Sequence, residues 1–198
     1  MFDEKIIELI FGKRGSGKSY LAKTRLRDQK RYLVYDTLGH DYSEGVIIES
    51  IKQLTGFWKN TYRGNFRIIY RPLDPLGEFD QVCQLVWSCG NMAFLVEEID
   101  CFCPTDQRSL PEGLRMVIQR GRHRGISLFG VTQRPKGISR LLTSQAKKMC
   151  IFNTTEPADV DYFKEVIGER IVETFSKLQQ YEYIEWIDGR DELLITKV

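Results

Sequence analysis

The 198-residue sequence has no long apolar segment, no strong excess of one charge and almost no histidine. No stretch approaches the roughly 18 uninterrupted apolar residues of a membrane-spanning helix, so we expect no transmembrane segment. Residues 1–5 carry no signal-peptide pattern, so we do not expect a secreted protein. Because the formal net charge is only +2, any contact with nucleic acid must come from a local basic patch.

Cysteine is scarce and odd in number, with five residues at Cys83, Cys89, Cys101, Cys103 and Cys150. An odd count without an export signal predicts reduced thiols and an intracellular protein. Cys101 and Cys103 lie too close together for the usual zinc pair, and the only histidines are His40 and His123. We therefore expect these cysteines to be small apolar side chains, not metal ligands.

Short apolar runs alternate with amphipathic segments, and 42% of the residues are hydrophobic, as in a globular protein. The pattern predicts strands at residues 6–11, 32–35, 66–70, 92–96, 126–131 and 148–153. It predicts helices at residues 19–29, 78–89 and 110–119, the last with Pro111 in its first turn. This alternation indicates an α/β fold with a mainly parallel sheet and helices on both faces.

The C-terminal segment has a different pattern. Two short helices broken near Gly168 are predicted within residues 160–179, and β-rich runs follow at 181–187 and 192–198. Asp188-Gly189 between these runs indicates a hairpin at the sheet edge or packed beside it. We expect one domain over residues 1–198, with a core at about 5–155 and a C-terminal extension at about 156–198.

A glycine-rich segment between the first strand and the first helix matches the pattern G-x-x-x-x-G-K-[ST] at every fixed position. Its glycines let the backbone approach phosphate oxygens, and the helix that follows adds its positive N-terminal end. Lys18 is expected on the β- and γ-phosphates of ATP and Ser19 on Mg²⁺. The residues expected to bind nucleotide are Gly12, Lys13, Arg14, Gly15, Ser16, Gly17, Lys18, Ser19 and Tyr20, although solvated side chains are the alternative for Lys13 and Arg14.

Polar side chains also follow two later strands. Glu97 and Glu98 come after the strand at 92–96, and parallel strands bring their carboxyl ends to the rim that carries the glycine-rich loop. Because adjacent strand residues point to opposite sides, we expect Glu97 at the metal and Glu98 at the attacking water. Asp100 is a rival for either role, and surface carboxylates are the alternative. Gln133, after the next strand, is expected to sense the γ-phosphate, unless its amide makes only a turn hydrogen bond.

A basic segment spans residues 115–140, which hold no acidic residue. Its seven basic residues are Arg115, Arg120, Arg122, Arg124, Arg134, Lys136 and Arg140. Such residues can contact nucleic-acid phosphates, reach a neighbouring subunit's nucleotide as an arginine finger, or form a solvated face. The sequence leaves these three interpretations open.

Taken together, these segments resemble the FtsK/HerA superfamily of P-loop motor ATPases over residues of about 6–155. The resemblance rests on the loop at 12–19, the strand ending Val96-Glu97-Glu98, and Gly121-Arg122-His123-Arg124-Gly125 followed by Thr132-Gln133-Arg134-Pro135. Residues 34–42 are also similar to the family's strand-Asp-x-x-Gly-x-Tyr element. One departure is Glu97, because the family usually has Asp at the first acidic position.

The resemblance implies a RecA/ASCE-like fold and a ring-forming ATPase, pentameric or hexameric, that pumps double-stranded DNA. It implies nucleotide and Mg²⁺ at Lys18 and Ser19, the acidic pair at Glu97 and Glu98, and Gln133 as sensor. It also implies that Arg122 acts on the neighbouring subunit's site, with Arg120 and Arg124 as alternatives.

The length of the chain indicates which members of this superfamily it is most similar to. A β-barrel, membrane anchor or winged helix, as in cellular members, does not fit in 198 residues. The chain is therefore most similar to genome-packaging ATPases of tailless, membrane-containing double-stranded DNA viruses. This similarity implies a capsid or viral membrane protein as a further partner, and a location in the host cytoplasm or at a virion vertex.

Three other functions stay open. The chain can be a phage assembly or export ATPase similar to zonula occludens toxin, or a cellular HerA-like DNA translocase. A nucleotide-dependent switch or small-molecule kinase is a third class, but the sequence shows no signature of a lid or an acceptor pocket. Stimulation of hydrolysis by duplex DNA distinguishes the DNA motors from the export ATPase.

Overall fold

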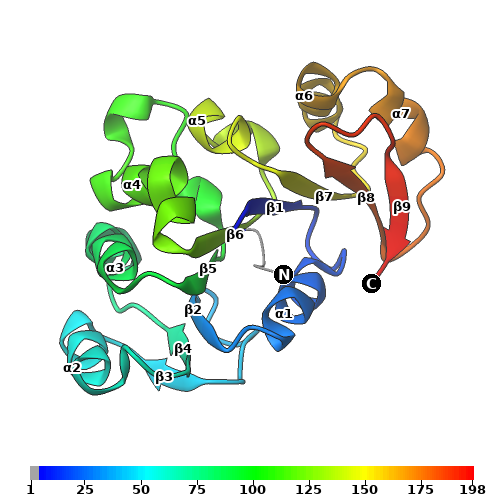
Figure 1. Ribbon diagram of the computed structural model, residues 1–198. Coiled ribbons are helices and arrows are strands. Elements are labelled where there is room, and N and C mark those ends of the chain that lie inside the picture. Colours follow the sequence, from blue (N-terminus) through cyan, green and yellow to red (C-terminus); the bar gives the residue numbers. More distant parts are fainter. Residues whose placement is uncertain (1–4) are drawn as a thin grey trace.

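The computed structural model describes residues 5–198 (Figure 1). Within them, nine strands form one sheet in the order β3-β4-β2-β5-β6-β1-β7-β8-β9. The strands are β1 (Ile7–Phe11), β2 (Arg31–Tyr35), β3 (Val46–Ile48), β4 (Phe66–Tyr70), β5 (Met92–Val96), β6 (Ile126–Thr132), β7 (Lys148–Phe152), β8 (Glu182–Ile187) and β9 (Leu194–Lys197). All neighbouring pairs from β3 to β7 are parallel, whereas β8 and β9 are added antiparallel at one end.

The helices lie on both faces of this sheet, most of them on one (Figure 1). They are α1 (Lys18–Arg27), α2 (Ile51–Thr61), α3 (Pro75–Cys89), α4 (Glu112–Arg120), α5 (Arg140–Thr143), α6 (Pro157–Ile167) and α7 (Arg170–Phe175). No helix within residues 5–198 is both long enough and apolar enough to cross a membrane.

Alternate residues of the central strands enter two separate hydrophobic cores. Leu9 of β1 packs in the larger core with α3, α4 and α6, while its neighbour Ile10 packs in a smaller core with Leu21 and Leu26 of α1. Because both faces are covered, strands such as β5 are apolar at every position. The predicted α/β fold, with a mainly parallel sheet and a C-terminal hairpin, is confirmed.

Helix α1 is attached to the sheet by charge as well as by apolar contact. Glu8 of β1 is only 2% exposed, and its carboxylate accepts a 2.7 Å hydrogen bond from Arg25 Nε of α1. The same guanidinium lies 3.6 Å from Glu185 of β8. Buried carboxylates of this kind require a charged partner, so the pair fixes how α1 leaves the loop that follows β1.

The strand order brings four loops to one rim. β6 lies between β5 and β1, and β2 lies on the other side of β5. Since these strands are parallel, the segments that follow them all start at the same edge of the sheet. These segments begin at residues 12, 36, 97 and 133.

Several element boundaries differ from the sequence prediction. Helix α3 begins at Pro75, earlier than predicted, because the Asp74 side chain caps it by accepting from the Gly77 amide. Helix α4 begins at Glu112, so Pro111 is the residue before its first turn. The hairpin loop spans residues 188–193 and is longer than the tight turn that Asp188-Gly189 indicated.

Among the strands and α-helices, β3, α2 and α5 were missed. β3 and α5 have only three and four residues, too few for a periodic pattern. Helix α2 contains Gly56 and the β-branched Thr55 within its interior, which weakens its helical signal. Ser50 defines its start by accepting a hydrogen bond from the Gln53 amide.

Candidate functional site

The loop between β1 and α1 is a tight backbone cradle. A Cβ atom at Gly12 would stand 2.6 Å from Ser16 Oγ and 2.7 Å from Phe152 Cβ, so the close approach requires glycine. Gly15 and Gly17 have φ of +77° and +108°, values that side chains disfavour. Gly17 precedes α1 without a capping side chain, which leaves the first amides of the helix free to face an anion.

Polar groups inside this cradle have few partners of their own. Lys18 Nζ donates to the Lys13 carbonyl oxygen at 2.8 Å. The buried Ser16 hydroxyl finds no hydrogen-bond partner within residues 5–198. Burial lowers the pKa of Lys18, an effect opposed by the carboxylates of Glu97, Asp41 and Glu98. The uncapped start of α1 and the Lys18 ammonium lie at the cleft, so the cradle is suited to an anion with several acceptor oxygens.

The two glutamates after β5 lie in different environments. Glu97 is 2% exposed and accepts a hydrogen bond from the Tyr42 hydroxyl, whereas Glu98 is half-buried. Burial raises the pKa of Glu97 to about 7, while the Tyr42 hydrogen bond and the Lys18 ammonium act against this rise. β5 ends at Val96, so the expected strand alternation does not extend to Glu98, whose φ of +50° turns the chain instead.

Asp100, the predicted rival, points elsewhere. Its carboxylate accepts a 2.6 Å hydrogen bond from the Thr132 hydroxyl, and it does not line the cleft that holds Glu97 and Glu98. Its position ties the segment after β5 to the end of β6. Gln133, the residue after Thr132, does line this cleft.

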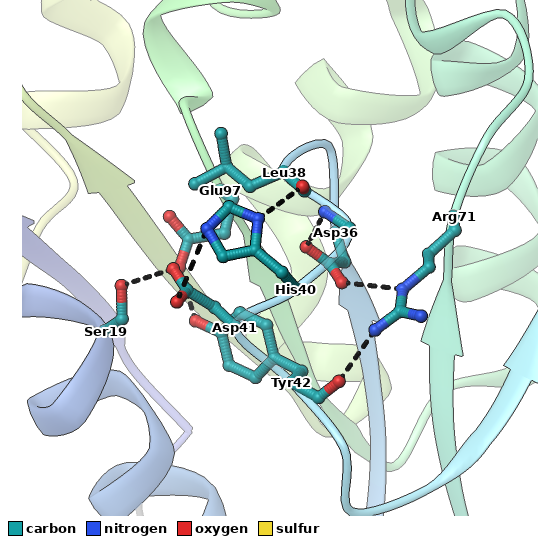
Figure 2. Close-up of polar contacts among 9 residues, drawn as sticks. Ser19, Asp36, Leu38, His40, Asp41, Tyr42, Arg71 and Glu97 are labelled. Atoms are coloured by element: carbon teal, nitrogen blue, oxygen red, sulfur yellow. Dashed lines mark hydrogen bonds and ion pairs between the residues drawn. The ribbon is translucent and has the colours of Figure 1, made fainter.

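The segment at residues 36–42, after β2, forms a fixed bridge over the rim (Figure 2). The buried Asp36 carboxylate accepts from the Gly39 amide at 2.9 Å and from Arg71 Nε at 3.0 Å. Arg71 also donates to the Tyr42 carbonyl oxygen at 2.8 Å. Both ends of the segment are therefore bonded to one guanidinium.

This bridge contacts both the start of α1, which follows the phosphate cradle, and the acidic pair after β5. Asp41 accepts a 2.8 Å hydrogen bond from the Ser19 hydroxyl, and the adjacent Tyr42 donates to Glu97 (Figure 2). The exposed His40 imidazole lies beside Asp41, with Nε2 4.0 Å from its carboxylate. No role was predicted for Asp41 or Tyr42 from the sequence, although both lie in the segment that resembles the strand-Asp-x-x-Gly-x-Tyr element.

These parts enclose an open cleft of about 520 Å³. Its lining side chains and glycines come from four rim segments and from the start of the C-terminal hairpin: Arg14, Gly15, Gly17, Lys18, Ser19, Tyr20, Leu38, His40, Asp41, Glu97, Glu98, Val131, Thr132, Gln133 and Tyr181. The structure thus brings most of the candidate residues together at one place. Tyr181 was not foreseen, because no local pattern marks it.

Arg122 lies far from its own chain's cleft. It precedes β6 and lines a small cavity of about 70 Å³ with Lys5 and Lys147, which precede β1 and β7. This is the amino edge of the parallel strands, opposite the cleft. Arg124 donates to the carbonyl oxygens of Trp87 and Ser88 at 3.2 and 2.9 Å, at the end of α3. A role of Arg122 in a neighbouring subunit's site stays a prediction.

The donor set in the cleft suits Mg²⁺. Ser19, Asp41 and Glu97 provide a hydroxyl and two carboxylates, the hard oxygen ligands that this ion prefers. Mg²⁺ is usually held by one or two protein carboxylates together with substrate phosphates. The arrangement therefore fits an ion shared between this edge of the cleft and an anion in the cradle.

Comparisons with known proteins agree with this geometry at the level of fold. No family model matches the sequence, and no curated protein matches it. The genome-packaging NTPase B204 of Sulfolobus turreted icosahedral virus 2, solved with ATP-gammaS, is 20% identical with a TM-score of 0.82 and 98% of both chains covered. B204 of Sulfolobus turreted icosahedral virus, described as a DNA-packaging ATPase, is 21% identical with a TM-score of 0.78, over 100% of this chain and 98% of that one.

A third solved structure is more distant. The N-terminal domain of zonular occludens toxin from Neisseria meningitidis is 16% identical with a TM-score of 0.56, over 98% of this chain and 93% of that chain. The likeness in all three cases is one of fold, and it confirms the predicted P-loop NTPase architecture.

The bridge at 36–42 predicts a difference between two arginines near β4. Arg71→Met leaves the fully buried Asp36 carboxylate without its charged partner, so the free energy of unfolding should fall by about 1–3 kcal/mol or more. Arg67→Met is the matched control, because Arg67 faces the exposed Glu44 at 3.7 Å and should cost less than about 1 kcal/mol. Urea denaturation of both variants measures the difference, and equal losses would contradict the account of the bridge.

Proposed function

We propose that this protein hydrolyses ATP with Mg²⁺ in the cleft and uses the energy to move double-stranded DNA, in the packaging of a viral genome. The observation that carries the proposal is the meeting of Lys18 and Ser19 with Glu97, Glu98 and Gln133 in one cleft. The likeness to the B204 packaging NTPases, solved with ATP analogues, supports it.

The cradle binds and orients the triphosphate. Amides of the loop at 12–19 donate to phosphate oxygens, and Lys18 exchanges the Lys13 carbonyl for them. Ser19 and Glu97 would hold Mg²⁺, with Asp41 beside them. When bound, the ion neutralises charge on the phosphate oxygens.

Glu98 and Gln133 act at the attacking water. The water oxygen forms a bond to the γ-phosphorus, the bond to the bridging oxygen breaks, and ADP and phosphate leave. Glu98, the more exposed of the two glutamates, accepts the water's proton. The Gln133 amide can bond both the water and a γ-phosphate oxygen, so it distinguishes the triphosphate from the diphosphate.

DNA contact is proposed for the basic segment at 115–140. Arg134 and Lys136 are exposed just after β6, on the cleft side of the sheet. Arg122 lies on the opposite edge, so it can complete a nucleotide site only in a neighbouring subunit of a ring. Such a ring would act at a virion vertex or in the host cytoplasm.

A second candidate function is assembly or export of protein. The likeness to the N-terminal domain of zonular occludens toxin favours it, but at a lower TM-score than the packaging NTPases. Duplex DNA should stimulate ATP hydrolysis by a packaging motor, whereas a protein should stimulate hydrolysis by an assembly or export ATPase.

Glu98→Gln should separate binding from chemistry. Loss of the general base is expected to lower ATP turnover by about 100-fold or more, while the dissociation constant for Mg·ATP changes little, since the cradle is intact. Phosphate release and calorimetry measure the two quantities. Glu112→Gln, an exposed carboxylate in α4, is the control and should keep wild-type turnover. A Glu98→Gln protein with normal turnover would remove Glu98 from the reaction.

Duplex DNA should raise ATP turnover, and specific activity should rise with protein concentration. Sites shared between subunits are completed only when subunits associate, and contacts of the basic segment with DNA phosphates should weaken as salt increases. Phosphate release is measured with and without duplex DNA at several salt and protein concentrations. ATP turnover that does not change with DNA in any of these conditions would contradict the packaging function and favour export.

A further inference from the structure

Tyr181 is an aromatic side chain at the cleft that the proposed reaction does not use. It stands just before β8 and is 46% exposed, although most aromatic rings of the chain are buried in the two cores. It lines the cleft together with Arg14, Gly15 and Gly17 of the phosphate cradle. The C-terminal extension therefore contributes a side chain to the same cleft as the N-terminal loop.

The backbone holds Tyr181 in a rare conformation. Its φ is +65°, and the only other non-glycine residues with positive φ within residues 5–198 are Asn91 and Glu98. Such values are uncommon for a bulky residue. The conformation is fixed by hydrogen bonds from the Val198 amide to the Tyr181 carbonyl oxygen, and between Gln179 and Glu182 on either side, all between 2.9 and 3.1 Å.

The same hydrogen bonds place the end of the hairpin against the cradle. Val198 Cγ2 lies 3.2 Å from the place a Cβ would take at Gly17, so the absence of a side chain at Gly17 leaves room for the hairpin. Phe152, at the end of β7, also lies next to this Cβ position of Gly17. Tyr181 is therefore held beside the cradle through Val198 and Gly17.

We propose that Tyr181 is the platform on which the base of the bound nucleotide stacks, which adds a base-binding site to the phosphate site. The proposal rests on the proposed ATP binding and names the part of the ligand that the hairpin recognises. A base is planar and uncharged, and the face of an aromatic ring stacks on any base. Lys18 and Ser19 bind the phosphate end of the nucleotide. The neutral ring of Tyr181 on the cleft wall is then free to bind the base at the other end.

Tyr20 is the other aromatic side chain of the cleft and the natural rival. It is 59% exposed, but it also lines a separate cavity of about 170 Å³ with Lys23, Tyr32 and Tyr42, on the side of β2. Its backbone is helical and carries no comparable constraint. The experiment must therefore include both tyrosines.

The test compares a ligand with a base and a ligand without one. Wild type and Tyr181→Gly are titrated by calorimetry with Mg·ATP and with Mg·tripolyphosphate. Glycine suits the positive φ, so this variant removes the ring without backbone strain, and Tyr181→Asn, which also tolerates this region, is the second variant should the first fail to fold. We expect affinity for ATP to fall by about 10-fold or more and affinity for tripolyphosphate to stay within about twofold, as the phosphate cradle is unchanged.

Two control variants complete the design. Tyr181→Phe keeps the ring and should bind ATP like wild type, whereas an ATP affinity that falls in Tyr20→Ala and not in Tyr181→Gly would assign the base platform to Tyr20 instead. Equal ATP affinity in wild type and Tyr181→Gly would overturn the base platform while leaving the phosphate site in place. Equal losses for both ligands would also overturn it, because Tyr181 would then only shape the cradle. If wild type binds neither ligand, the proposed function fails together with the platform.

Discussion

The parallel hydrogen bonding of β1, β6, β5 and β2 decides where every candidate residue lies. Four strands that end at one edge deliver the cradle, the glutamine, the acidic pair and the bridge at 36–42 to the same rim. The two hydrophobic cores cover both faces of this sheet, and the pair of Glu8 and Arg25 fixes α1 against it. A change of strand order would separate these groups even if every motif were kept.

Of the residues that the structure describes, three carboxylates but only two cationic side chains line the cleft, so its formal charges do not balance. Lys18 faces Glu97, Asp41 and Glu98, and the buried Ser16 hydroxyl lacks a partner within residues 5–198. The Tyr42 hydroxyl donates to the Glu97 carboxylate, and burial raises the pKa of this carboxyl to about 7. Binding of a triphosphate with a divalent cation would supply acceptors for the cradle amides and Lys18, and positive charge for the carboxylates, which is why the site is suited to that ligand.

Much of the site could be predicted from the sequence because its parts are local motifs at strand ends. The loop at 12–19, Glu97, Glu98 and Gln133 were placed on one rim by the rule for parallel sheets alone. The hydrogen bonds of Asp41 and Tyr42 could not be predicted, because they depend on β2 lying beside β5. Tyr181 depends on an antiparallel strand added at β7, and Asp100 turned to Thr132 because the chain bends after Val96.

The most direct measurement for the central claim is binding of ATP to wild type, Lys18→Ala and Lys23→Ala by calorimetry, with and without Mg²⁺. Lys23 lies in the same helix, outside the 520 Å³ cleft, and serves as the matched control. The account predicts that wild type and Lys23→Ala bind ATP more tightly with Mg²⁺ and that Lys18→Ala loses at least about 10-fold in affinity, as expected when a buried charge-assisted contact is removed. Binding that is equal in all three proteins and indifferent to Mg²⁺ would contradict a magnesium–triphosphate site at this rim.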